Sequence, residues 1–224
     1  MNRLEQVQAR IRSAAEGAGR SARDIVLLAV SKKQPLERIR ALIVAGQRRF
    51  GENYVDEALD KMTCLADDAL EWHFIGPIQS NKTRALAESF DWVQSVDRIK
   101  VVRRLSKQRP AGMVPLNVLI QVDLDDEPQK AGCIAADIED LAAAIDAAPN
   151  LVLRGLMAIP APRTDPAEQT AVFARLHGLY QELAERHPSV DTLSAGMSAD
   201  LEAAVAAGST MVRVGTDLFG PRPD

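Results

Sequence analysis

A regular alternation of short apolar runs and amphipathic segments constrains the fold of this chain more than any other feature. Eight runs of strand length recur along the sequence, and a segment of helical period separates each run from the next. Strands that are joined through helices favour a parallel sheet. We therefore predict one α/β domain over residues 1–224, a single (β/α)8 TIM barrel near the lower end of the usual ~200–400 residues. An open doubly wound sheet is the alternative, but no G-x-G-x-x-G motif follows the first run.

The apolar runs give the positions of the expected strands. They are 25–31, 48–53, 72–76, 91–95, 115–123, 151–159, 191–196 and 210–215. The segment at about 1–19 is expected to be an amphipathic helix, with Leu4, Val7 and Ile11 on its inner face. The barrel is thus preceded by one additional helix.

Local signals mark where three further helices begin. Pro35 is expected at a first helical position, and Gly46 is suited to end the same helix. Asp165 is expected as an N-cap, with Pro166 as the first helical residue. Ser198 is expected to cap the helix that precedes the eighth strand.

Charge and hydropathy exclude several classes of partner. The 27 Lys and Arg residues and the 31 Asp and Glu residues give a formal net charge of −4, with no polybasic run. We therefore expect neither nucleic acid nor an anionic membrane surface as a partner. No apolar stretch approaches the ~20 residues of a transmembrane helix. The N-terminal segment also lacks the apolar core of a secretory signal.

The cysteine and histidine residues bear on whether the chain forms disulfides or binds a metal ion. Cys64 and Cys133 are too few for a disulfide framework and do not form a C-x-x-C pair, so we expect a reduced, cytoplasmic protein. His73, His177 and His187 are scattered, with no carboxylate or cysteine at metal-ligand spacing. We therefore expect no metal site.

The loops after the seventh and eighth strands have the composition of a phosphate site. Active groups of such barrels lie at the C-terminal ends of the strands, and phosphates commonly bind after strands seven and eight. The first loop contains Gly196 and Ser198, and the second contains Gly215 and Thr216. Backbone amides and hydroxyl groups at these turns can bind an anion. The alternative is that Ser198 only caps its helix and Gly215 only turns the chain.

A lysine pair follows the first strand, which neighbours the eighth in a closed barrel. Side chains alternate along a strand, so Lys32 and Lys33 are expected to point to opposite sides. Desolvation at a barrel mouth lowers the pKa of a lysine and favours Schiff-base formation with a carbonyl. Lys32 directly follows the apolar run and is our candidate, although a lysine at a strand end is often simply solvated.

Four further residues near the strand ends are candidate ligand contacts or core residues. Arg213 lies inside the eighth apolar run and needs an acceptor, which is either a bound ligand or a buried carboxylate such as Glu52. Asn53 follows the second strand and is expected to hydrogen-bond a ring substituent of a ligand. His73 and Met157 are expected to be core residues.

Taken together, six segments resemble the pyridoxal-phosphate homeostasis family, the YggS/PROSC-type proteins that bind pyridoxal 5′-phosphate (PLP). The resemblance covers essentially the whole chain, and six motifs in this order are highly specific. They are SKKQP (31–35), FGENYVDEA (50–58), WHFIGPIQSNK (72–82), RGLMAIP (154–160), SAGMSADLEAA (194–204) and GSTMVRVGTDLFG (208–220).

The resemblance implies both a fold and a cofactor site. The fold is PLP fold type III, similar to the N-terminal domain of bacterial alanine racemase. PLP would be held as a Schiff base on Lys32, with its phosphate bound by Ser198, Gly215 and Thr216. Arg213 would lie near either the ring nitrogen or the phosphate.

Two positions add specific expectations to this resemblance. Asp217 stands where a small neutral residue is common in the family, so we expect its carboxylate to oppose the phosphate. Lys130 matches a family lysine in the loop after the fifth strand. It either contacts a second ligand or is solvated.

The resemblance implies a non-catalytic protein that buffers PLP or delivers it to PLP-dependent apo-enzymes. The main alternative is a weak PLP-dependent amino-acid racemase, which needs an acid–base group opposite the lysine. In alanine racemases this group is a tyrosine from an additional C-terminal domain, whereas this sequence ends at Asp224 and contains only Tyr54 and Tyr180. We therefore expect no catalytic residue and no robust turnover.

Two further expectations concern the reaction class and the assembly. A class I aldolase-type barrel commonly carries its Schiff-base lysine on strand six, but the run at 151–159 has no lysine. No exposed apolar helix face stands out in the sequence, so we expect a monomer.

Overall fold

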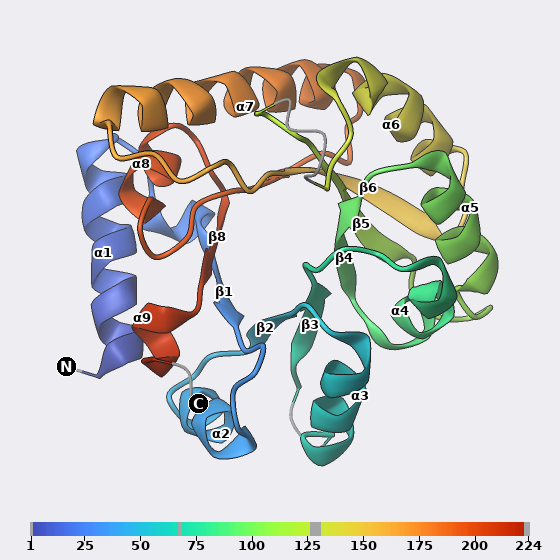
Figure 1. The fold of residues 1–224 in the computed structure, drawn as a ribbon, viewed down its shortest axis with the longest axis horizontal. Helices are drawn as coiled ribbons and strands as arrows, with labels where there is room; N and C mark the ends of the chain where they lie inside the picture. The colour runs from blue at the N-terminus through green and yellow to red at the C-terminus, as the bar shows by residue number, and fades with distance from the viewer. Residues whose placement is uncertain (1, 67–68, 126–130, 222–224) are drawn as a thin grey trace.

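The eight strands close into one parallel barrel, in the order β1-β2-β3-β4-β5-β6-β7-β8. This architecture is seen in a computed structural model that describes residues 2–66, 69–125 and 131–221. The helices surround the ring of strands on the outside (Figure 1). The predicted (β/α)8 barrel is confirmed.

The strands are short, as is usual for a barrel of this size. They are β1 (Val26–Val30), β2 (Arg49–Glu52), β3 (Glu71–Phe74), β4 (Trp92–Val96), β5 (Leu116–Gln121), β6 (Leu151–Met157), β7 (Thr192–Ser194) and β8 (Met211–Val214). The α-helices are α1 (Arg3–Gly17), α2 (Leu36–Val44), α3 (Val55–Cys64), α4 (Thr83–Ser89), α5 (Ile99–Gln108), α6 (Ile138–Asp146), α7 (Pro166–Arg186), α8 (Leu201–Ala206) and α9 (Thr216–Phe219). The described residues also form the 3-10 helices η1 (Ala22–Asp24), η2 (Ser80–Lys82) and η3 (Ala135–Asp137).

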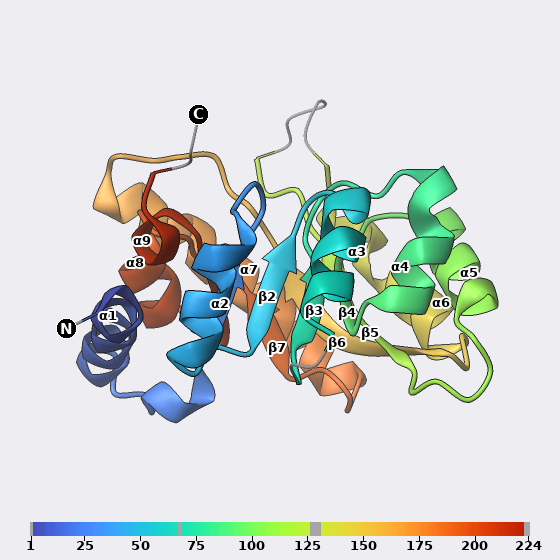
Figure 2. The same cartoon turned by 90° about the horizontal axis from the view of Figure 1, so that it is seen from below.

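The N-terminal helix α1 packs on the outside of the barrel, beside α8 and α9 (Figures 1 and 2). A capping box starts it, because Asn2 and Glu5 each accept a hydrogen bond from the other's backbone amide. Leu4, Val7 and Ile11 are buried on its inner face. The predicted helix and its apolar stripe are confirmed.

Two of the predicted helix starts are wrong in detail. Pro35 is the N-cap of α2 rather than its first helical residue. Ser198 does not cap α8, because this helix begins at Leu201 and Asp200 occupies the N-cap position. Asp200 instead accepts a hydrogen bond from the Met197 amide at 2.5 Å, which tightens the turn after β7. The capping of α7 by Asp165 is confirmed, with its carboxylate accepting from the Ala167 amide at 2.8 Å.

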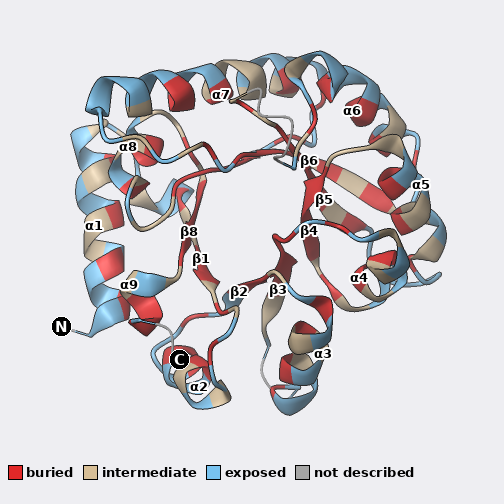
Figure 3. Cartoon of the chain, viewed as in Figure 1, coloured by how far each residue is buried: buried red, intermediate tan, exposed pale blue. Residues whose placement is uncertain are grey.

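The main hydrophobic core lies between the strands and the surrounding helices. Buried residues line the inner faces of the helices and the strands, whereas the outer helix faces are exposed (Figure 3). Apart from this core, the described residues form two small apolar clusters, which are Leu28, Ile75 and Met211, and Trp92, Leu119 and Met157. Polar side chains fill much of the remaining interior.

None of the described helices combines the length and the apolar character that crossing a membrane requires. The longest, α7, has 21 residues and a mostly exposed polar face.

Candidate functional site

The two lysines after β1 occupy different environments. Lys33 is exposed and has a backbone φ of 57°, and its Nζ lies 5.8 Å from the centroid of the Tyr54 ring. Its amide donates a hydrogen bond to Glu57 Oε1 at 2.6 Å. Lys32 is half-buried. The expected separation of the two side chains therefore agrees with their environments, and the assignment of Lys32 as the ligand lysine stays a prediction.

A third lysine, which sequence reasoning missed, fixes the backbone beside this pair. Lys61 extends from α3 into the protein and donates hydrogen bonds to the Ser31 carbonyl at 2.7 Å, to Glu52 Oε1 at 2.7 Å and to Glu57 Oε1 at 2.6 Å. These three contacts use all three ammonium protons. Lys61 thus holds the residue that precedes Lys32. The signal in the sequence was a lysine on the apolar face of α3, where it needs a buried anion.

Glu52 is the buried anion that faces Lys61. Its carboxylate is fully buried and also accepts a hydrogen bond from the Ser31 hydroxyl at 2.6 Å. Burial raises the pKa of Glu52 above its ordinary value, and the Lys61 charge opposes this shift. Glu52 Oε2 has no hydrogen-bond partner within the described part of the chain.

Asn53 follows β2 and presents a buried polar atom without a partner. Its Oδ1 accepts no hydrogen bond from any described residue. The loop after β3 packs directly on its backbone, because a Cβ placed on Gly76 would lie 2.3 Å from the Asn53 carbonyl oxygen. A buried acceptor without a partner is costly, so Asn53 is suited to receive a ligand donor.

Arg213 is buried inside the barrel without a carboxylate in hydrogen-bond contact among the described residues. Its Nη1 donates to Ser194 Oγ at 2.7 Å and its Nη2 donates to the Ala158 carbonyl at 2.7 Å. Burial lowers the pKa of Arg213 to about 10. The alternative that Glu52 accepts from Arg213 is wrong, because Glu52 contacts Lys61 instead.

The loop after β8 lies beside the end of β1, and the phosphate role of this loop and of the loop after β7 stays a prediction. Gly215 and Thr216 begin α9, and Gly215 packs on Val30 at the end of β1, where a Cβ would lie 3.5 Å from the Val30 side chain. Ser198 lies in the turn that precedes α8. Ser198 and Thr216 retain exposed surface at this mouth.

Arg10 from α1 connects these two loops. Its Nη2 donates to the Ser198 carbonyl at 2.9 Å, and its Nη1 contacts Asp217 Oδ2 at 2.5 Å. A further ion pair at 2.7 Å joins Arg10 to Glu202 of α8. The charge of Asp217 is therefore compensated by Arg10. The expectation that this carboxylate opposes a phosphate did not include this counter-charge.

The remaining sequence candidates are core residues or lie outside the description. His73 is fully buried and hydrogen-bonded, and Met157 is fully buried, which confirms both as core residues. Lys130 lies outside the described residues. In the described part of the chain, no group of three or more His, Cys, Asp or Glu residues is placed to hold a metal ion.

The barrel and its C-terminal mouth define a class of domain. A sequence model of the alanine racemase N-terminal domain family matches residues 3–223. A solved alanine racemase from Corynebacterium glutamicum is 20% identical, with a TM-score of 0.67 over 99% of this chain and 62% of that chain. At this identity the likeness shows a shared fold.

Closer relatives narrow this class to one family. A pyridoxal phosphate homeostasis protein from Pseudomonas aeruginosa is 56% identical, covering 98% of this chain and 94% of the relative. The protein of the same name from Escherichia coli is 52% identical, covering 98% of this chain and 95% of the relative. The chain therefore belongs to the pyridoxal phosphate homeostasis protein family.

A solved structure supports the same relationship. PipY from Synechococcus elongatus, whose structure was determined with PLP bound, is 38% identical to this chain. Its TM-score is 0.81, and the match covers 94% of this chain and 100% of that chain.

Proposed function

We propose that this protein is a PLP-binding homeostasis protein that holds the cofactor at the C-terminal mouth of its single barrel domain, residues 1–224. The observation that carries this proposal is the pairing of β1 with β8. Leu28 lies beside Arg213 in the register of the two strands, and Lys32 follows at the end of β1. A lysine at the end of β1 and a buried arginine in the neighbouring strand, which contacts no carboxylate of the described residues, suit a carbonyl ligand that carries negative charge.

The residues at this mouth fit PLP in their donor and acceptor types. Lys32 would attach the cofactor covalently, and Asn53 Oδ1, which has no hydrogen-bond partner among the described residues, would bind a polar ring substituent. Ser198, Gly215 and Thr216 would bind the phosphate through hydroxyl groups and backbone amides. Arg213 has N–H groups beyond those that contact Ser194 and Ala158, and these would bind the cofactor. When bound, PLP supplies an electrophilic carbon and an electron-accepting ring.

The same residues favour storage of PLP over turnover. Racemisation needs a second acid–base group opposite the lysine. Tyr54 is 50% exposed and lies against Lys33, whereas Tyr180 lies within α7, 6.1 Å from the His177 ring centroid. Burial raises the pKa of Tyr180 further from neutrality. An Arg213 donor at the pyridine nitrogen would also keep that nitrogen unprotonated and weaken the ring as an electron sink.

The proposal extends to the setting in which the protein acts. We infer a cytoplasmic monomer that passes PLP to apo-enzymes. Cys64 and Cys133 are both free thiols, as expected in a reducing compartment. The exposed large aliphatic residues of the described chain come from different segments, which are the end of α2 and the loops before β5, before η3 and after β6; they are Val44, Met113, Val114, Ile134 and Ile159. Light scattering after size-exclusion chromatography tests the monomer, and transfer of PLP to an apo-enzyme tests delivery.

Titration of the apo-protein with PLP tests the proposed function. We expect a visible absorbance band that saturates in the wild type and is lost in Lys32→Ala. Lys33→Asn is the matched control, because asparagine tolerates the left-handed backbone of this position. Retention of the band in Lys32→Ala would reject the assignment of Lys32. Steady racemisation of L-alanine that disappears in Lys32→Ala would reject the non-catalytic role.

A further inference from the structure

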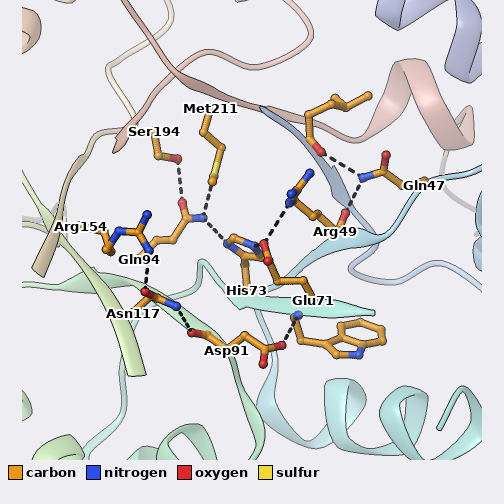
Figure 4. A network of polar contacts seen from close by, with 12 residues as sticks. Gln47, Arg49, Glu71, His73, Asp91, Gln94, Asn117, Arg154, Ser194 and Met211 are labelled. Atoms are coloured by element: carbon orange, nitrogen blue, oxygen red, sulfur yellow. Dashed lines mark hydrogen bonds and ion pairs between the residues drawn. The ribbon is translucent and has the colours of Figure 1, made fainter. Parts of the chain in front are cut away.

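A continuous chain of hydrogen bonds crosses the interior of the barrel, and its central part is drawn in Figure 4. It begins at Arg213, whose Nη1 lies 2.7 Å from Ser194 Oγ. Ser194 Oγ lies 2.7 Å from Gln94 Oε1, and Gln94 Nε2 lies 2.8 Å from His73 Nδ1. His73 Nε2 lies 2.7 Å from Glu71 Oε1. Four strands, β8, β7, β4 and β3, contribute to the chain.

Donor chemistry gives every link of this chain the same direction. A guanidinium can only donate, so Ser194 Oγ accepts from Arg213 and gives its own proton to Gln94 Oε1. The amide nitrogen of Gln94 then donates to His73 Nδ1. His73 therefore carries its proton on Nε2, which donates to Glu71. Aligned hydrogen bonds of this kind polarise and strengthen one another.

Because its members are buried, the hydrogen-bond chain from Arg213 to Glu71 is sensitive to the loss of any one residue. Ser194, Gln94 and His73 have no exposed surface, and Arg213 is 3% exposed. Burial is also the main reason why the pKa of His73 is lowered, which favours the neutral imidazole that the chain requires. Removing one link leaves a buried donor or acceptor without a partner.

The chain ends on a carboxylate at the opposite mouth of the barrel. Glu71 is the first residue of β3 and is paired with Arg49 at 3.1 Å. Burial opposes ionisation, but the hydrogen bond from His73 and the charge of Arg49 lower the pKa of Glu71 below its ordinary value. The two charged ends, Arg213 and Glu71, are thus joined through three neutral groups.

We propose that Gln94 and His73 are positioning residues for the cofactor, which they influence through Ser194 and Arg213. This inference rests on the proposed PLP-binding function. The chain holds the Ser194 hydroxyl as an acceptor for Nη1, while the Ala158 carbonyl holds Nη2. Together these contacts fix the guanidinium plane and leave its other donors for the ligand. Gln94 and His73 touch neither of these donors directly.

Two variants that break the hydrogen-bond chain and one conservative variant test this role. Gln94→Met keeps the length of the side chain but breaks both links, and His73→Leu removes the acceptor for Gln94. His73→Asn retains an acceptor close to the position of Nδ1. Ser95→Ala is the control, because Ser95 is a buried β4 serine whose hydroxyl donates to the Gly76 carbonyl at 2.6 Å, outside the chain.

The readouts are the PLP dissociation constant, the absorbance maximum of bound PLP and the melting temperature of the apo-protein. We expect Gln94→Met and His73→Leu to bind PLP about tenfold more weakly, with a displaced absorbance maximum. His73→Asn should retain the wild-type spectrum. Ser95→Ala should lose melting temperature without a change in the spectrum.

Different results overturn different parts of the account. Wild-type affinity and spectrum in Gln94→Met and His73→Leu, with only the melting temperature reduced, would show that the chain is purely structural. If Gln94→Met does not fold, identical spectra for His73→Leu and His73→Asn would reject the inference by themselves. Failure of the wild type to bind PLP would instead overturn the proposed function, and this inference with it.

Discussion

Replacement of Lys61 by methionine should cost the protein much of its stability. The Lys61 side chain is 7% exposed, and its ammonium contacts the fully buried Glu52 carboxylate at 2.7 Å. Methionine fills nearly the same volume but cannot donate a hydrogen bond. Lys61→Met therefore leaves the Ser31 carbonyl without its donor and the Glu52 carboxylate without its counter-charge.

The magnitude follows from what Glu52 can do once Lys61 is absent. The cheapest response is to take up a proton, which at pH 7 costs ~3 kcal/mol for a carboxyl with an ordinary pKa of 4.5, at about 1.4 kcal/mol per pH unit. This value is close to the ~3–5 kcal/mol typical of removing one partner from a buried ion pair. The folded variant then binds a proton that the unfolded chain has released. Its stability should therefore fall as the pH rises from about 5 to about 8.

Urea unfolding followed by tryptophan fluorescence measures this effect at several pH values. Lys82→Met is the matched control. Lys82 forms an ion pair with Asp56, which lies in α3 like Lys61, but this pair is more exposed, with side-chain exposures of 33% for Lys82 and 78% for Asp56. We expect the control to lose less than ~1 kcal/mol. Equal losses in the two variants, or a loss in Lys61→Met that does not grow with pH, would refute this reasoning.

Three further predictions concern the phosphate loops and the cysteines. Arg10→Met should weaken PLP binding roughly three- to tenfold, because Arg10 holds the Ser198 loop and the α9 loop together. The control Arg12→Met, at an exposed position of the same helix, should leave PLP binding unchanged. A fluorescence titration with PLP measures both. Asp217→Asn should fail to tighten PLP in the same titration, because the Asp217 charge is compensated by Arg10; tighter binding at low salt would contradict this. Burial raises the pKa of the Cys133 thiol to about 12, so a thiol reagent at pH 8 should modify only the exposed Cys64 until the protein unfolds, and equal rates at both cysteines would contradict this.

The periodicity of the sequence was sufficient to predict the barrel and its element order. Strand ends were less accurate, because the runs 25–31 and 151–159 are each two residues longer than β1 and β6. The start of α8 was also missed. Ser198 has the residue type of an N-cap, but Asp200 makes the competing turn that delays the helix.

The candidate site could be predicted only where residues lie close to strand ends. Lys32 and Asn53 were proposed in this way and Arg213 from its place inside the eighth apolar run, and their binding of PLP stays a prediction. Lys61 was missed because its contacts with Ser31 and Glu52 join segments 30 and nine residues away along the chain. The pairing of Asp217 with Arg10 spans 207 residues, and no local pattern indicates it.

The chain of hydrogen bonds from Arg213 to Glu71 was also invisible in the sequence. His73 was correctly predicted to be a core residue, but its partners come from other strands. Ser194 lies between the apolar Leu193 and Ala195, whereas Gln94 lies between Val93 and Ser95, so alternation alone does not mark Gln94 as an inward-facing residue. That the two side chains meet depends on the register and closure of the barrel, which only the structure provides.

Covalent attachment of PLP at Lys32 is the most direct test of the central claim. The protein loaded with PLP is reduced with borohydride, digested, and mapped by mass spectrometry. We predict that the pyridoxyl mass lies on the peptide containing Lys32 and that fragmentation assigns it to that residue. A pyridoxyl group found only on Lys33, Lys61 or Lys130 would contradict the proposed site.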